Sequence, residues 1–90
     1  MSYTKENIPK ELIDAARLIS EDKLKKAEPI LRDYLKNYPL DVNAMKLLGD
    51  IGVKFRAYKD AGYLFSRALD LSPDYDEARL SYANLLYKRQ

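Results

Sequence analysis

The sequence predicts an all-α fold of five helices in one domain. Its apolar residues fall in amphipathic runs, and no segment alternates between apolar and polar residues as a half-buried strand does. Prolines and short polar stretches separate these runs. The third observation is internal repetition, because residues 34 positions apart match at small, apolar and proline positions. A chain of 90 residues fits a single domain with a thin core.

The first two helices are separated by a polar break. Pro9 suits the first position of a helix, where its missing N–H costs nothing, and this helix runs to about Ile19. Residues 20–22 break the chain, and the second helix follows to about Asn37. Pro29 lies about one turn inside the second helix and removes one backbone hydrogen bond. That helix therefore either starts late or bends at Pro29.

The third and fourth helices have clear boundaries in the sequence. Asp41 is a good N-cap for a third helix over residues 42–55. A short break at residues 56–57 leads into the fourth helix, over residues 58–71. We therefore expect these two helices to form a helical hairpin.

The fifth helix opens at Asp74 or Tyr75 and runs to about Lys88. Asp74 and Asp76 are paired carboxylates at its start. Capping and the helix dipole explain acidic residues there better than acid–base catalysis does. We therefore expect these two residues to support the helix.

Small residues on the third and fourth helices predict close packing. Ala61 and Ala68 leave flat places on the fourth helix, against which neighbouring helices can lie. Gly49 and Gly52 do the same for the third helix, at a cost of about 1 kcal/mol each in helix propensity relative to alanine. Close helix contacts are the compensation we expect for that cost.

Eight tyrosines against two phenylalanines are unusual for a chain of this length. Tyrosine serves either a core or a binding surface, because its ring buries apolar area while its hydroxyl stays hydrated. We expect Tyr34, Tyr58 and Tyr63 to pack between helices and Tyr82 to belong to the core. For Tyr87 both roles remain open.

The internal repeat has a step of 34 residues. The identical pairs are Lys25 and Lys59, Ala27 and Ala61, Leu35 and Leu69, Pro39 and Pro73, Ala44 and Ala78, and Lys54 and Lys88. This step is the period of the tetratricopeptide repeat, a helix–turn–helix unit. The chain resembles that family most clearly over residues 41–73. The matching residues are Ala44, Leu48, Gly49, Tyr58, Ala61, Phe65, Ala68 and Pro73.

Three positions depart from the family pattern. Met45, Gly52 and Arg56 stand where the family has tryptophan, tyrosine and the turn glycine. The resemblance nevertheless implies about two and a half units of antiparallel helix hairpins in a short right-handed solenoid. These are a degenerate repeat over 8–40, a repeat over 41–73, and a half repeat or capping helix over 74–90.

The amino-acid composition removes the residues that most often carry catalysis and metal binding. The chain contains no cysteine and no histidine, which removes thiolate nucleophiles, the commonest general base and the commonest metal ligand. We therefore expect no catalytic site, no cofactor and no metal. A net charge of +2 is too small to indicate nucleic acid. Because no long apolar run is present, we expect no membrane span, no secretory signal and a cytoplasmic location.

The resemblance implies a non-catalytic scaffold that binds a protein or peptide on the concave face formed by the first helix of each pair. The family's groove positions carry over to Asn43, Lys46, Asp50, Val53 and Lys54 in the third helix, to Glu77, Leu80, Asn84, Tyr87 and Lys88 in the fifth, and to Pro9, Leu12, Ala16, Ile19 and Ser20 in the first. Asp50 stands where members that hold a peptide carboxylate have a neutral amide. Lys54 and Lys88 form either a cationic strip toward an acidic partner or merely two solvated lysines.

The fifth helix is apolar over much of its circumference, more than a one-sided cap requires. One explanation is that the chain is the N-terminal piece of a longer protein. The other is self-association through the last helix, giving a homo-oligomer. Residues 76–90 resemble the repeat segments that precede sulfotransferase-type domains in some bacterial proteins. That resemblance implies an accessory fragment of an enzyme whose catalysis lies beyond residue 90.

Overall fold

The computed structural model describes residues 7–89, and within this range the chain is helical, without a β-strand. The five helices are α1 (Lys10–Ser20), α2 (Leu24–Asn37), α3 (Val42–Lys54), α4 (Tyr58–Leu71) and α5 (Asp76–Lys88). The prediction of an all-α fold with five helices is therefore confirmed.

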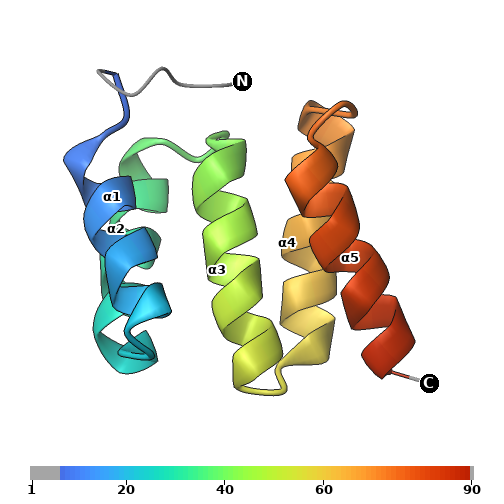
Figure 1. Ribbon diagram of the computed structural model, residues 1–90. Helices are drawn as coiled ribbons and strands as arrows, with labels where there is room; N and C mark the ends of the chain where they lie inside the picture. The colour runs from blue at the N-terminus through green and yellow to red at the C-terminus, as the bar shows by residue number, and fades with distance from the viewer. Residues whose placement is uncertain (1–6, 90) are drawn as a thin grey trace.

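The helices form two layers. Each helix packs against the next one along the chain, and α3 also contacts both α1 and α5. Figure 1 shows α1, α3 and α5 in front, with α2 and α4 behind them. The front layer therefore consists of alternate helices, and their N-terminal ends lie at the same end of the layer.

Helix boundaries recur along the chain. Helices α2 and α4 begin at Leu24 and Tyr58, which are 34 residues apart, and both contain 14 residues. Helices α3 and α5 begin at residues 42 and 76, also 34 apart, and both contain 13 residues. The same spacing of 34 residues relates the identical residue pairs in the sequence.

The turns after α1 and α3 share one hydrogen-bond pattern. The N–H of Lys23 donates to the Leu18 carbonyl, and the N–H of Ala57 donates to the Gly52 carbonyl, both at 2.8 Å. The residue before each donor has a positive φ, 62° at Asp22 and 61° at Arg56. This is the Schellman ending, in which a left-handed residue lets two amides satisfy the last carbonyls.

The structure decides how Pro9 and Pro29 are placed relative to α1 and α2. Pro9 is the N-cap of α1 and Lys10 is its first residue, so Pro9 lies one position outside the helix. Helix α2 begins at Leu24 and contains Pro29. The alternative that this helix starts late is therefore wrong, and Pro29 is accommodated inside it without an N–H to offer Lys25.

The start of α5 differs from the prediction. Its N-cap is Tyr75, and no side chain caps it, so the expected capping by Asp74 is wrong. Asp74 instead accepts a hydrogen bond from the Ser72 hydroxyl at 3.2 Å. Asp76 lies in the first turn of α5, where a carboxylate interacts favourably with the helix dipole.

The small residues of α3 and α4 lie where the two helices meet. A Cβ at Gly49 would stand 2.5 Å from Cε1 of the Phe65 ring, and one at Gly52 would stand 3.2 Å from the Ala61 Cβ. Ala61, Phe65 and Ala68 are fully buried. The prediction that glycine and alanine allow close helix packing is therefore confirmed at these positions.

Asp41 is a buried N-cap. One carboxylate oxygen accepts hydrogen bonds from the backbone N–H groups of Asn43 and Ala44, both at 3.0 Å, as the sequence predicts. The other oxygen accepts from the Tyr34 hydroxyl at 2.9 Å. This carboxylate therefore connects α2 to the start of α3.

The tyrosines divide between core and surface. Tyr34 is buried and Tyr58 is half-buried, as predicted, but Tyr63 is 66% exposed, so its predicted packing role is wrong. Tyr82 is half-buried, with its ring centroid 6.4 Å from that of Phe65. Tyr87 is exposed.

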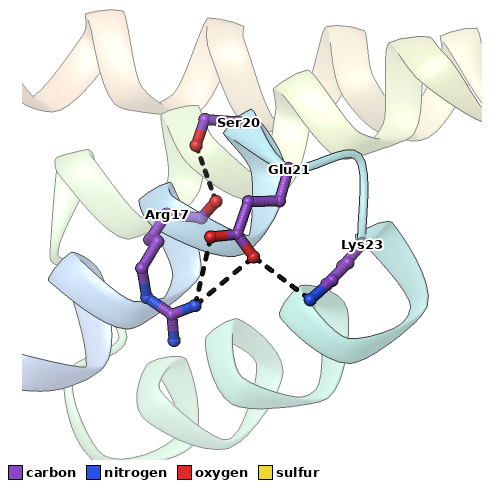
Figure 2. Close-up of polar contacts among 4 residues, drawn as sticks. All are labelled: Arg17, Ser20, Glu21 and Lys23. Atoms are coloured by element: carbon purple, nitrogen blue, oxygen red, sulfur yellow. Dashed lines mark hydrogen bonds and ion pairs between the residues drawn. The ribbon is translucent and has the colours of Figure 1, made fainter.

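The turn between α1 and α2 is held by exposed polar contacts (Figure 2). Glu21 accepts from Arg17 Nη1 at 3.4 Å and pairs with Lys23 Nζ at 3.3 Å, while Ser20 Oγ donates to the Arg17 carbonyl at 2.7 Å. The hydrogen bond from Lys23, assisted by the charge of Arg17, lowers the pKa of Glu21. Because these groups are exposed, they support the turn only weakly.

Candidate docking groove

An open groove of about 830 Å³ lies at the N-terminal end of the front layer. It is bounded by the first half of α1, the first half of α3, and the turn from α4 into α5. The lining residues are Ile8, Leu12, Ile13, Ala16, Asn43, Lys46, Leu47, Ser72, Asp74, Tyr75, Asp76 and Glu77. The groove therefore joins residues from the first, second and third parts of the chain.

One wall of the groove is apolar and comes mainly from α1. Leu12 is buried in the core shared with α2, whereas Ile13 on the same helix is 49% exposed and lines the groove. Ile8 before the helix and Leu47 on α3 are partly buried and extend this wall. Apolar side chains that stay accessible in a concavity are typical of a surface that binds another molecule.

The floor contains an ion pair between two predicted groove residues. Lys46 Nζ lies 2.7 Å from Asp50 Oδ2, one turn further along α3. Both side chains are largely shielded, at 18% and 24% exposure. The Lys46 ammonium is therefore already matched by a carboxylate within the chain.

The opposite wall is acidic. Asp74, Asp76 and Glu77 all line the groove at the start of α5. Arg79 pairs with Asp76 at 2.7 Å and also donates to the Pro73 carbonyl. Within residues 7–89, Asp74 and Glu77 form no ion pair.

Tyr75 lies between these carboxylates. Burial raises the pKa of its hydroxyl to about 12, and the charges of Glu77, Asp50 and Asp41 act in the same direction. The phenol therefore stays neutral and remains a hydrogen-bond donor at physiological pH. These three carboxylates lie close enough to Tyr75 to disfavour a second negative charge there.

The groove includes only some of the predicted contact residues. Asn43, Lys46 and Glu77 line it, and Asp50 reaches it through Lys46. From α1, Leu12 and Ala16 line the groove, whereas Pro9, Ile19 and Ser20 do not. The remaining predicted contacts lie farther along the front layer and outside the groove: Val53, Lys54, Leu80, Asn84, Tyr87 and Lys88.

Sequence reasoning missed the turn between α4 and α5 as part of a site. Ser72, Asp74 and Tyr75 enter the groove because that turn packs beside α3, a contact between elements about 30 residues apart in the chain. The acidic residues around Pro73 were noted in the sequence, but they were predicted only to stabilise the start of the fifth helix. Only their placement opposite Ile13 gives them a shared surface.

No group of acidic side chains in residues 7–89 converges as a metal site would require. No helix in that range is long and apolar enough to cross a bilayer. Comparison of the chain with protein-family models, curated proteins and solved structures finds no match. The functional assignment therefore rests on the groove itself.

Proposed function

We propose that this chain is a non-catalytic scaffold that binds a protein or peptide in the groove between α1, α3 and the start of α5. The observation that carries this proposal is the joining of an apolar wall with polar side chains in one open concavity of about 830 Å³. Sites that bind small molecules and peptides combine apolar area with a few placed polar groups. The Tyr75 hydroxyl and the Asn43 amide offer such groups.

The proposed architecture is about two and a half tetratricopeptide-like units in a short right-handed solenoid. Its support is the recurrence, at a step of 34 residues, of helix boundaries and turn hydrogen bonds. Burial recurs at the same step, because Ala27 and Ala61 are fully buried, as are Ala44 and Ala78. In a stack of such hairpins, alternate helices share one face, and that face would carry the groove.

A binding role fits the residues better than catalysis does. The chain has no histidine or cysteine, so acid–base or nucleophilic chemistry in the groove would depend on its carboxylates, Lys46, Ser72 or Tyr75. Asp76 is paired with Arg79, and Asp50 with Lys46. These pairings engage both carboxylates in contacts within the chain.

The test is a selection of peptides from a random display library on the immobilised chain, followed by affinity measurements on two variants. Ile13→Ala removes apolar area from the groove wall, and Tyr63→Ala removes a similarly exposed apolar side chain from α4. We expect Ile13→Ala to weaken binding by roughly tenfold, or about 1.4 kcal/mol, and Tyr63→Ala to leave it within about twofold.

Circular dichroism of both variants controls for folding. Equal effects of the two substitutions, or a library that yields no binder sensitive to Ile13, would contradict the proposal. Amide chemical shifts supply a second readout, since a groove ligand should perturb α1, α3 and the start of α5. Perturbations confined to α2 and α4 would place the ligand on the wrong face.

Self-association through α5 is a second candidate function. Leu80, Leu86 and Tyr87 are exposed on this helix, at 64%, 47% and 77% respectively. Exposed apolar patches of this kind mark contact surfaces when they are contiguous. Sedimentation velocity over a wide range of concentrations tests whether the chain self-associates. A strict monomer at all concentrations rules this candidate out, and a dimer that Leu80→Lys dissociates supports it.

A further inference from the structure

The groove contains more negative charge than its residue types suggest. Among residues 7–89, the one cationic lining residue is Lys46, which is held by Asp50 at 2.7 Å, and both side chains are shielded. Within the same range, only Asp76 of the three acidic lining residues has a cationic partner, Arg79, which is exposed. Asp74 and Glu77 thus leave two uncompensated carboxylates on the wall that faces α1.

The geometry points to an occupant of defined chemistry: a peptide segment that combines apolar side chains with lysine or arginine. This inference rests on the proposed binding function and names the partner of that same groove. Apolar side chains of the peptide pack against Ile8, Ile13 and Leu47. Its cationic groups lie at the opposite wall, beside Asp74 and Glu77. An acidic partner, which Lys54 and Lys88 favour in the sequence, would be repelled by this wall.

Helix dipoles do not reverse this charge preference. The N-terminal ends of α1, α3 and α5 meet near the groove, and each such end carries about half a positive charge. The buried carboxylate of Asp41 caps α3. Asp76 and Glu77 occupy the first turn of α5, and Glu11 that of α1. A full negative charge at each end outweighs the partial positive charge of the backbone.

The Tyr75 hydroxyl adds a neutral donor at the floor. The hydroxyl stays protonated because burial and the surrounding carboxylates disfavour tyrosinate. A neutral donor suits a carbonyl of the bound peptide backbone, while the cationic side chains lie against the carboxylates. Peptide backbone, cationic side chain and apolar side chain therefore each have a matching group in the groove.

The test uses three matched short peptides in which leucine alternates with lysine, glutamine or glutamate. Each is titrated into the isotopically labelled chain while amide shifts of α1, α3 and α5 are followed. We expect the lysine peptide to bind the groove tightest and the glutamate peptide weakest. The affinity of the lysine peptide should fall with added salt, because the attraction between exposed charges is screened over a Debye length of about 10 Å at 0.1 M ionic strength.

A charge-neutral variant assigns the effect to the groove. Asp74→Asn combined with Glu77→Gln removes both carboxylates, and asparagine keeps an oxygen that can accept from Ser72. The matched control is Asp60→Asn with Asp70→Asn, the same change of charge at two exposed positions of α4. We expect the groove variant to weaken lysine-peptide binding by roughly three- to tenfold and to reduce its salt dependence. The control should stay within about twofold.

The outcomes separate this inference from the proposed function. If the glutamine or glutamate peptide binds the groove as tightly as the lysine peptide, the charge preference is wrong while peptide binding stands. Equal losses in the groove variant and the α4 control would also overturn it, since net charge alone would then explain binding. If library-selected peptides and all three matched peptides fail to perturb the groove, the proposed function fails with it.

Discussion

The Phe65 ring on α4 lies against Gly49 on α3, so closely that a Cβ at Gly49 would stand 2.5 Å from ring atom Cε1. Phe65 is fully buried. Glycine therefore allows the backbone of α3 to approach the largest buried side chain of the protein. The helix pair that supports one side of the groove depends on this contact.

The first prediction concerns this glycine. Gly49→Ala gains about 1 kcal/mol of helix propensity but overpacks the core at a cost of about 1–3 kcal/mol. We expect a net loss of about 1–2 kcal/mol in the free energy of unfolding, measured with urea. Gly62→Ala is the control, because its Cβ would lie 3.5 Å from Leu85 Cδ2, an ordinary contact. That variant should be more stable by about 0.5–1 kcal/mol, and equal effects of the two would refute the close-packing interpretation.

The second prediction concerns the hydrogen bond from Tyr34 to Asp41. Tyr34→Phe removes a buried donor at 2.9 Å from the capping carboxylate, so we expect a loss of about 1 kcal/mol in the free energy of unfolding. Asp41→Ala also removes the cap of α3 and should cost about 2 kcal/mol. Tyr38→Phe serves as the control, since Tyr38 is exposed and should change stability by less than about 0.5 kcal/mol. A Tyr34→Phe variant as stable as the parent would contradict this prediction.

The third prediction concerns the left-handed residue after α3. Arg56 has a φ of 61°, where a side chain is strained by about 1–2 kcal/mol and glycine is not. We expect Arg56→Gly to raise the unfolding free energy by about 1 kcal/mol. Arg67→Gly makes the same substitution inside α4 and should lower it by about 1 kcal/mol. Destabilisation by both variants would show that the Schellman turn does not favour glycine.

The fourth prediction concerns Pro29, which is exposed inside α2. Pro29→Ala supplies the N–H that a helix interior uses and removes the clash of the ring with the carbonyl one turn earlier. We expect the free energy of unfolding of this variant, measured by thermal unfolding, to rise by about 1–2 kcal/mol. Pro39→Ala, outside the helices, should instead lower stability by less than about 1 kcal/mol, because the unfolded chain becomes more flexible. A loss of stability in Pro29→Ala would mean that α2 needs the proline.

The fifth prediction is a pH dependence. The pKa of Tyr75 rises from 10.0 to about 12 on folding, so the folded state binds more protons between these values than the unfolded state does. Stability from this group is therefore present below pH 10 and is lost as the pH rises toward 12. Tyr75→Phe should show a smaller fall in stability across this window than the parent chain. In an ultraviolet titration, the variant should lack a tyrosine that ionises near pH 12, and identical curves would contradict the assignment.

Much of the fold could be predicted from the sequence because helix boundaries depend on nearby residues. Asp41 caps α3 as expected, and α4 spans Tyr58–Leu71 as expected. Turn chemistry was harder to read, since Asp22 and Arg56 adopt the left-handed conformation without being glycine. Tyr63 was misjudged because its neighbours in sequence do not show which side of α4 remains uncovered.

The candidate site was only partly predictable. Asn43 and Lys46 follow from the repeat pattern and line the groove. The charge of the site does not follow from that pattern, because Lys46 is matched by Asp50, and Asp74 comes from the turn before α5. Net charges of side chains add along a sequence, whereas the potential in a groove depends on which charges are close in space.

By itself, the sequence determined how many helices form, roughly where each begins and ends, and which small residues let them approach. These properties arise from hydrogen bonds and steric preferences within a few residues of each position. Tertiary structure alone decided that Ile13 faces Asp74 and Glu77 across one groove. More than 50 residues separate these walls, and packing of α1 and α5 on opposite sides of α3 brings them together.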